Sequence, residues 1–111
     1  FMLLGWGAGS GEASSPLKAL LHTYDKSKGM GAANRGRHTD AKVDALIQKA
    51  LATVDAGARG KLLAEATEKA VGENYGVIPM HYQVNTWAAQ KGYSYLPRTD
   101  ERTIVTGLSG S

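Results

Sequence analysis

A tryptophan set among glycines near the start of the chain is the feature with the clearest chemical meaning. Trp6 lies between Gly5 and Gly7, and small residues continue through Gly9. Because glycine leaves the main chain uncovered, its N–H and C=O groups can bond to an extended ligand while a side group of that ligand packs on the indole. The pattern therefore predicts a ligand site. The alternative is that Trp6 fills the core at a strand end.

Two arginines form a second candidate site. Arg35 and Arg37 flank Gly36 just ahead of a predicted helix. Guanidinium groups and free backbone N–H groups at such a place can hold an anion. The alternative is that both arginines are solvated surface charges.

Catalysis and metal binding find little support. The chain has no Cys, so a disulfide or thiolate site is excluded. His22, His38 and His81 fall in different predicted elements, without the spacing of a compact ligand set. Gly9-Ser10-Gly11 matches only the centre of a nucleophile elbow, and the glycines at 5–11 do not follow the order of a dinucleotide fingerprint. We therefore expect no enzyme activity, no metal and no cofactor.

Composition is typical of one small globular domain. The chain has 111 residues, of which 42% are hydrophobic and 21% charged, enough for a modest core. Its net charge of +3 allows weak attraction to anions, but acidic residues are interleaved with basic ones and no nucleic-acid motif is visible. No run approaches the roughly 20 apolar residues that cross a bilayer.

Helical periodicity is strongest in the middle of the chain. A short helix is expected at about 16–24, with Ser15 as N-cap and Pro16 at its first position. The next helix follows Thr39 as N-cap, and one near Ala58 follows the break at 55–57. The two should pack as an antiparallel hairpin, with Glu65 and Lys69 paired outside. Their predicted apolar stripes are Val43, Leu46, Ile47, Ala50, Leu51 and Val54, and Leu62, Leu63, Ala66, Ala70 and Val71.

Short strands are expected around the helices. Residues 1–4 suggest a buried strand, and β-prone residues recur in 77–84, where Pro79 favours a strand edge or a bulge. Further strand candidates are 86–89, 93–96 and 103–105. Residues 107–111 are small and polar, which predicts a flexible tail.

Four blocks in order resemble the solute-binding proteins of peptide and nickel ABC importers. They are the Gly-Trp segment, Asn-Arg-Gly-Arg at 34–37, Val-Asp-Ala-Leu-Ile at 43–47, and Val-Ile-Pro at 77–79 with Val-Asn at 84–85. The resemblance implies an α/β (type II) fold of two lobes that close on cargo. Residues 1–106 would form part of the C-terminal lobe, as an α+β fragment with a helical hairpin packed on short strands.

The same resemblance implies the site and the partners. The main chain of Gly5 and Gly7 and the ring of Trp6 would line the cleft, and Gln83 can face the ligand. Many relatives carry at the position of Gly9 an Asp that pairs with the ligand's ammonium, so here Glu12 substitutes, or the cargo is held by its other end, or it has no free amine. Arg35 is a further candidate. The implied partners are a peptide or similar solute, a membrane permease and the rest of an exported, extracytoplasmic parent chain, with no nucleic acid.

A different function class stays open. The chain could be a small basic interaction domain that binds nucleic acid or an acidic protein through Arg35, Arg37 and nearby lysines. Its affinity would then fall steeply with added salt.

Overall fold

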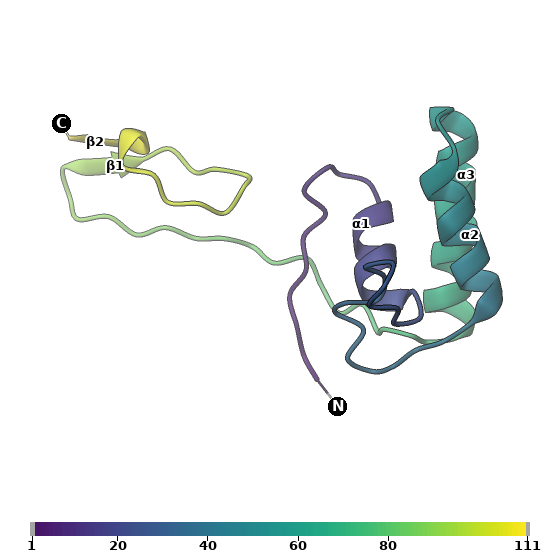
Figure 1. Ribbon diagram of the computed structural model, residues 1–111. Coiled ribbons are helices and arrows are strands. Elements are labelled where there is room, and N and C mark those ends of the chain that lie inside the picture. Colours follow the sequence, from purple (N-terminus) through teal and green to yellow (C-terminus); the bar gives the residue numbers. More distant parts are fainter. Residues whose placement is uncertain (1, 111) are drawn as a thin grey trace. The chain divides into compact units, whose positions relative to one another are not determined.

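The protein is a small mixed α+β domain, described here by a computed structural model over residues 2–110. It divides into a helical unit that ends at Pro79 and a smaller unit that begins at Met80 (Figure 1). In chain order the helical unit contains α1 (Ser14–Pro16), a π-helical segment (Leu17–Leu21), α2 (Ala41–Ala52), α3 (Ala56–Thr67) and a second π-helical segment (Glu68–Glu73). The smaller unit contains β1 (Tyr93–Tyr95), a 3₁₀ turn (Val105–Gly107) and β2 (Leu108–Gly110).

The predicted helical hairpin is confirmed. Helices α2 and α3 lie side by side and are joined by residues 53–55 (Figure 1). Their apolar stripes meet each other and the segment at 14–21, because residues three and four apart share one helix face. The buried apolar residues of this core are Leu17, Leu21, Val43, Ile47, Ala50, Leu63, Ala66 and Ala70. The hairpin therefore packs on helical turns, whereas both strands belong to the other unit.

One member of the predicted stripe lies outside the core. Val54 is 97% exposed, because α2 ends at Ala52 and Thr53 turns into extended backbone. The helical spacing that would have placed Val54 inward no longer applies there.

Aspartates cap both long helices. The carboxylate of Asp40 accepts hydrogen bonds from the N–H groups of Lys42 and Val43, so the expectation of Thr39 as N-cap was wrong by one residue. The Thr39 hydroxyl lies instead 2.9 Å from that of Thr23. Asp55 caps α3 by accepting from Ala58 N–H, so this helix begins at Ala56, ahead of the predicted start.

Lys69, in the π-helical segment that follows α3, pairs with a different carboxylate from the one predicted. Lys69 Nζ lies 2.8 Å from a carboxylate oxygen of Glu73, one turn ahead, and this contact raises the lysine pKa. Glu65, the predicted partner, acts on Lys69 only as a more distant charge. Both carboxylates lie four residues from the lysine, so spacing alone did not distinguish them.

The first helical segment is shorter than predicted. It runs from Ser14 to Leu21 instead of 16–24, its N-cap is Ala13, and no side chain caps it. Ser15 is inside the helix. The chain becomes extended at His22, so Tyr24 lies outside the helix and is 45% exposed.

The predicted strands are largely absent from the described residues. Met2, Leu3 and Leu4 are exposed and form no strand, and Phe1 lies outside the described residues. Segments 77–84 and 86–89 carry no regular structure. A β-prone sequence becomes a strand only where its N–H and C=O groups find a partner.

One predicted strand forms, with a partner that was not predicted. β1 pairs antiparallel with β2, with Tyr93 opposite Gly110 and Tyr95 opposite Leu108. β2 falls within the segment expected to be a flexible tail, and the predicted strand at 103–105 is replaced at Val105 by the start of a 3₁₀ turn. The hydroxyls of Ser94 and Ser109 also lie 2.6 Å apart across this pair.

Candidate functional site

The segment from Gly5 to Gly9 is an open stretch of chain. It has no regular structure, and all of its residues are exposed. Trp6 is 48% exposed, so it does not fill the core. An indole half in water beside uncovered main chain can pack against another molecule.

The glycines of this segment are not required by the surrounding structure. A Cβ added at Gly5, Gly7 or Gly9 would meet nothing within 4 Å, and none of the three has a positive φ. Gly31 provides the contrast, because its φ is +62° and a Cβ there would lie 2.4 Å from the His22 carbonyl oxygen. The fold thus explains Gly31 but leaves the three glycines beside Trp6 without an internal reason.

Glu12, a predicted ligand residue, forms an ion pair and a hydrogen bond within the protein. The Arg59 guanidinium makes a two-pronged ion pair with its carboxylate, with Nη2 2.8 Å from Oε2. Ser14 Oγ donates to the same Oε2 at 2.6 Å. The hydrogen bonds from Arg59 and Ser14 lower the pKa of Glu12 to about 2. This contact ties the end of the glycine-rich segment to α3.

The two loop arginines are in different environments. Arg37 has a φ of 54°, and its guanidinium carbon lies 4.5 Å from the centre of the Tyr24 ring, a cation–π contact. Arg35 is exposed to solvent. The structure therefore gives Arg37 a local packing role and leaves Arg35 open to an external partner.

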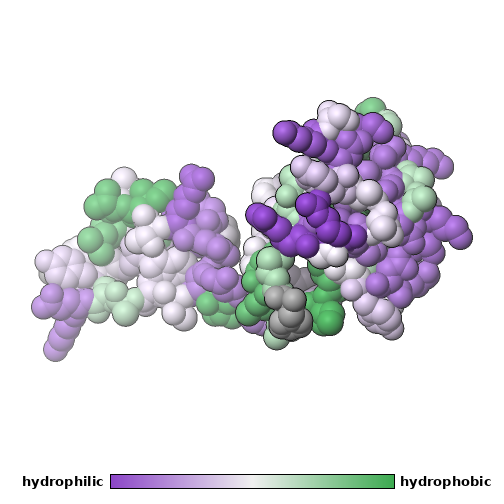
Figure 2. Space-filling view, turned by 60° about the horizontal axis from the view of Figure 1, so that its bottom comes forward, coloured by the Kyte–Doolittle hydropathy of each residue, from purple (hydrophilic) through white to green (hydrophobic). Residues whose placement is uncertain are grey.

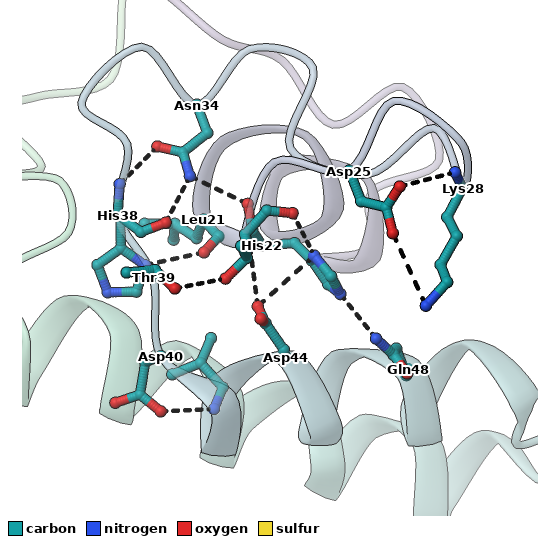
Figure 3. A network of polar contacts seen from close by, with 12 residues as sticks. Leu21, His22, Asp25, Lys28, Asn34, His38, Thr39, Asp40, Asp44 and Gln48 are labelled. Atoms are coloured by element: carbon teal, nitrogen blue, oxygen red, sulfur yellow. Dashed lines mark hydrogen bonds and ion pairs between the residues drawn. The ribbon is translucent and has the colours of Figure 1, made fainter.

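A buried asparagine organises the loop that carries these arginines (Figure 3). Asn34 is 4% exposed, and its Nδ2 donates to the carbonyl oxygens of His22 at 3.0 Å and His38 at 2.7 Å. Its Oδ1 accepts from His38 N–H at 2.9 Å. One amide thus satisfies three main-chain groups from two loop ends, and its loss would leave them buried without partners.

His22 connects this loop to α2 (Figure 3). It is 4% exposed, and its Nδ1 lies 2.7 Å from the Thr23 carbonyl oxygen and 3.5 Å from Asp44 Oδ1. Because a carbonyl oxygen only accepts, Nδ1 donates, and Gln48 Nε2 donates to the opposite ring nitrogen at 3.0 Å. His22 lies just past the helical segment that ends at Leu21.

The last predicted ligand residue belongs to the other unit. Gln83 is exposed, and its Nε2 donates to Asn85 Oδ1 at 3.1 Å. His81 and Tyr82, in the same irregular segment, are also exposed. A role for Gln83 in ligand binding stays a prediction.

Two hollows in the surface have no predicted ligand residue in their lining. One of about 420 Å³ lies over α2, α3 and the second π-helical segment, and charged side chains of both signs line it, among them Lys42, Lys49, Glu65 and Lys69. Within residues 2–110 no group of three or more His, Asp and Glu side chains is placed to hold a metal ion. No helix over the same range is long and apolar enough to cross a membrane.

Sequence reasoning missed the residues that anchor the site. Arg59 is 47 positions from Glu12, and no local pattern signals a contact over that separation. Asn34 was noticed only as part of the Asn-Arg-Gly-Arg block, although an Asn between glycine-rich turns is a common signal of side-chain to main-chain bonding.

Comparison with known proteins adds no further information. No known protein family, curated protein or solved structure matches the chain significantly.

Proposed function

We propose that this chain is part of the C-terminal lobe of an extracytoplasmic solute-binding protein that serves a peptide or nickel type ABC importer. It binds a peptide or similar solute in a cleft between two lobes and delivers it, unchanged, to a membrane permease. The observation that carries the proposal is the half-exposed Trp6 among glycines that neither crowding nor backbone conformation requires. Glycine costs conformational entropy on folding, and close approach of another molecule's backbone is a reason to keep it.

Exposed apolar residues give the proposal a second support. Ile78, Met80, Tyr82 and Val84 are 74%, 70%, 98% and 82% exposed, and green hydrophobic surface is visible on both units in Figure 2. Exposed β-prone segments with unpaired main chain invite strand pairing with another segment. Under the proposal, the remainder of the parent chain covers them.

The coding sequence upstream of Phe1 gives the first test. The proposal expects several hundred further residues upstream, beginning with a secretion or lipoprotein signal. A reading frame that starts close to Phe1 and encodes no export signal would refute it.

Glycine substitutions in the full-length gene product give the second test. Gly7→Ala and Trp6→Ala should each reduce retention of a tripeptide mixture at least about tenfold, because the first covers the main chain and the second removes the ring. Gly60→Ala in α3 is the matched control, since a Cβ there also meets nothing within 4 Å. Bound peptides are released by denaturation and counted by mass spectrometry. Equal retention by Gly7→Ala and Gly60→Ala would contradict the proposed site.

A basic interaction surface is the second candidate function. It is favoured by the exposure of Lys26 and Arg35 on the loop that Asn34 organises. Binding to an acidic polymer should then weaken steeply between about 50 and 200 mM salt. Affinity that barely changes over this range would dismiss it.

A further inference from the structure

The acidic residue nearest the candidate ligand segment is already engaged. Glu12 is the only Asp or Glu among residues 1–24, so a cationic group lying along Gly5–Gly9 would have this carboxylate as its nearest countercharge in sequence. Both carboxylate oxygens are used: Arg59 donates to Oε1 and Oε2, and Ser14 also donates to Oε2. An ammonium group would have to displace a bidentate guanidinium, which is the stronger geometry for a carboxylate.

The main chain of the same segment offers hydrogen-bond donors instead. Over residues 2–110, the N–H groups of Gly5, Gly7 and Gly9 donate no hydrogen bond, whereas Gly11 N–H closes a turn onto the Ala8 carbonyl oxygen at 2.8 Å. Free N–H groups beside uncovered glycine Cα atoms suit an acceptor oxygen.

We propose that the cargo presents a carbonyl or carboxylate oxygen, and not a free ammonium, to the Gly5–Gly9 segment, because the Glu12–Arg59 ion pair removes the carboxylate that would select an amine. This inference rests on the function proposed above and narrows its substrate class. Glu12 acts as a positioning residue that fixes the end of the Gly5–Gly9 segment on α3. Because Arg59 uses both oxygens of the Glu12 carboxylate, this carboxylate does not bind the ligand.

A matched peptide mixture tests the idea in the full-length gene product. The probe is a randomised tripeptide mixture, half of it N-acetylated, and the readout is the ratio of acetylated to free peptides retained by the protein. Wild type should retain acetylated peptides at least as well as free ones. Arg59→Gln releases the Glu12 carboxylate, so the ratio should shift about tenfold or more toward free amines, the size expected of a charge-assisted hydrogen bond.

The double variant Glu12→Gln/Arg59→Gln is the control. It also lacks the ion pair but has no carboxylate, so its ratio should return to that of wild type, and melting curves of both variants check that they are folded. A wild-type preference for free amines of tenfold or more that Glu12→Gln abolishes would overturn the inference while leaving the proposed function standing. Failure of wild type to retain either kind of peptide would overturn the proposed function, and the inference with it.

Discussion

The helical unit and the unit from Met80 onward differ in how their apolar residues are used. In the first, Leu17, Ile47 and Leu63 meet in a core, and the buried side chains come from helices whose backbone hydrogen bonds are internal. In the second, none of residues 80–110 is buried, although Trp87 and Tyr95 place their ring centres 5.7 Å apart. Helices can form before they pack, whereas strands require a partner for every N–H and C=O group.

The difference shows that apolar content alone does not make a core. The second unit has apolar and aromatic residues, but its two strands of three residues each present too little paired surface to cover them. Two-stranded hairpins are at best marginally stable alone. Stability of this chain therefore resides in the helical unit, and each of the following predictions tests that division.

The largest effect is expected from a leucine pair, one member in each unit. Leu63 is 4% exposed and Leu96 is 74% exposed. Leu63→Ala should lower the free energy of unfolding by about 2–5 kcal/mol, because it leaves a cavity in the core. Leu96→Ala should change it by less than about 0.5 kcal/mol. Urea unfolding followed by circular dichroism measures both, and similar losses would mean that the second unit has a core of its own.

Removing the buried amide of Asn34 should have the next largest effect. Asn34→Ala leaves the His22 and His38 carbonyl groups and the His38 N–H without partners. The expected loss is about 1–3 kcal/mol in the free energy of unfolding, measured in the same way. Asn85→Ala, which removes only an exposed contact with Gln83, is the control and should have little effect. A neutral Asn34→Ala would show that the loop is not held by this network.

Removing the N-cap of α2 should cost less stability, and it distinguishes the contributions of the neighbouring residues Thr39 and Asp40. Asp40→Ala should cost about 0.5–2 kcal/mol, because the N–H groups of Lys42 and Val43 lose their acceptor. Thr39→Ala should cost less, since its hydroxyl contacts only the exposed Thr23 hydroxyl. Melting curves of both variants decide between them, and a larger loss for Thr39→Ala would restore it as the cap.

The smallest effect concerns pH and the Glu12 ion pair. The pKa of Glu12 is lowered from 4.5 to about 2, so in the folded state its carboxylate stays ionised to a lower pH than in the unfolded state. Its contribution to stability is complete above about pH 4.5 and is lost as pH falls toward 2. The difference in Tm between wild type and Glu12→Gln should therefore shrink over that range. Glu68→Gln, which changes an exposed carboxylate, is the comparison. A Tm difference between wild type and Glu12→Gln that is constant with pH would contradict the ion pair.

Local pattern predicted the helices well and the strands poorly. The stripes of α2 and α3 followed from spacing, because every i, i+3, i+4 neighbour is fixed by the helix itself. Segment 77–84 has equally clear β-prone residues, yet it forms no strand, and β2 forms instead in small residues that looked like a tail. Strand pairing depends on a second segment, and nothing in a segment's own sequence specifies where that partner lies.

The candidate site shows the same division. The sequence by itself determined that Trp6 stands among glycines, that the middle of the chain folds as a helical hairpin, and that no thiolate chemistry is possible. Only the tertiary structure decided that Trp6 stays half exposed, and that Asn34 closes the basic loop. It also decided that Arg59 pairs with the Glu12 carboxylate, because contacts between side chains 47 positions apart arise from the packing of helices and loops and not from neighbouring residues.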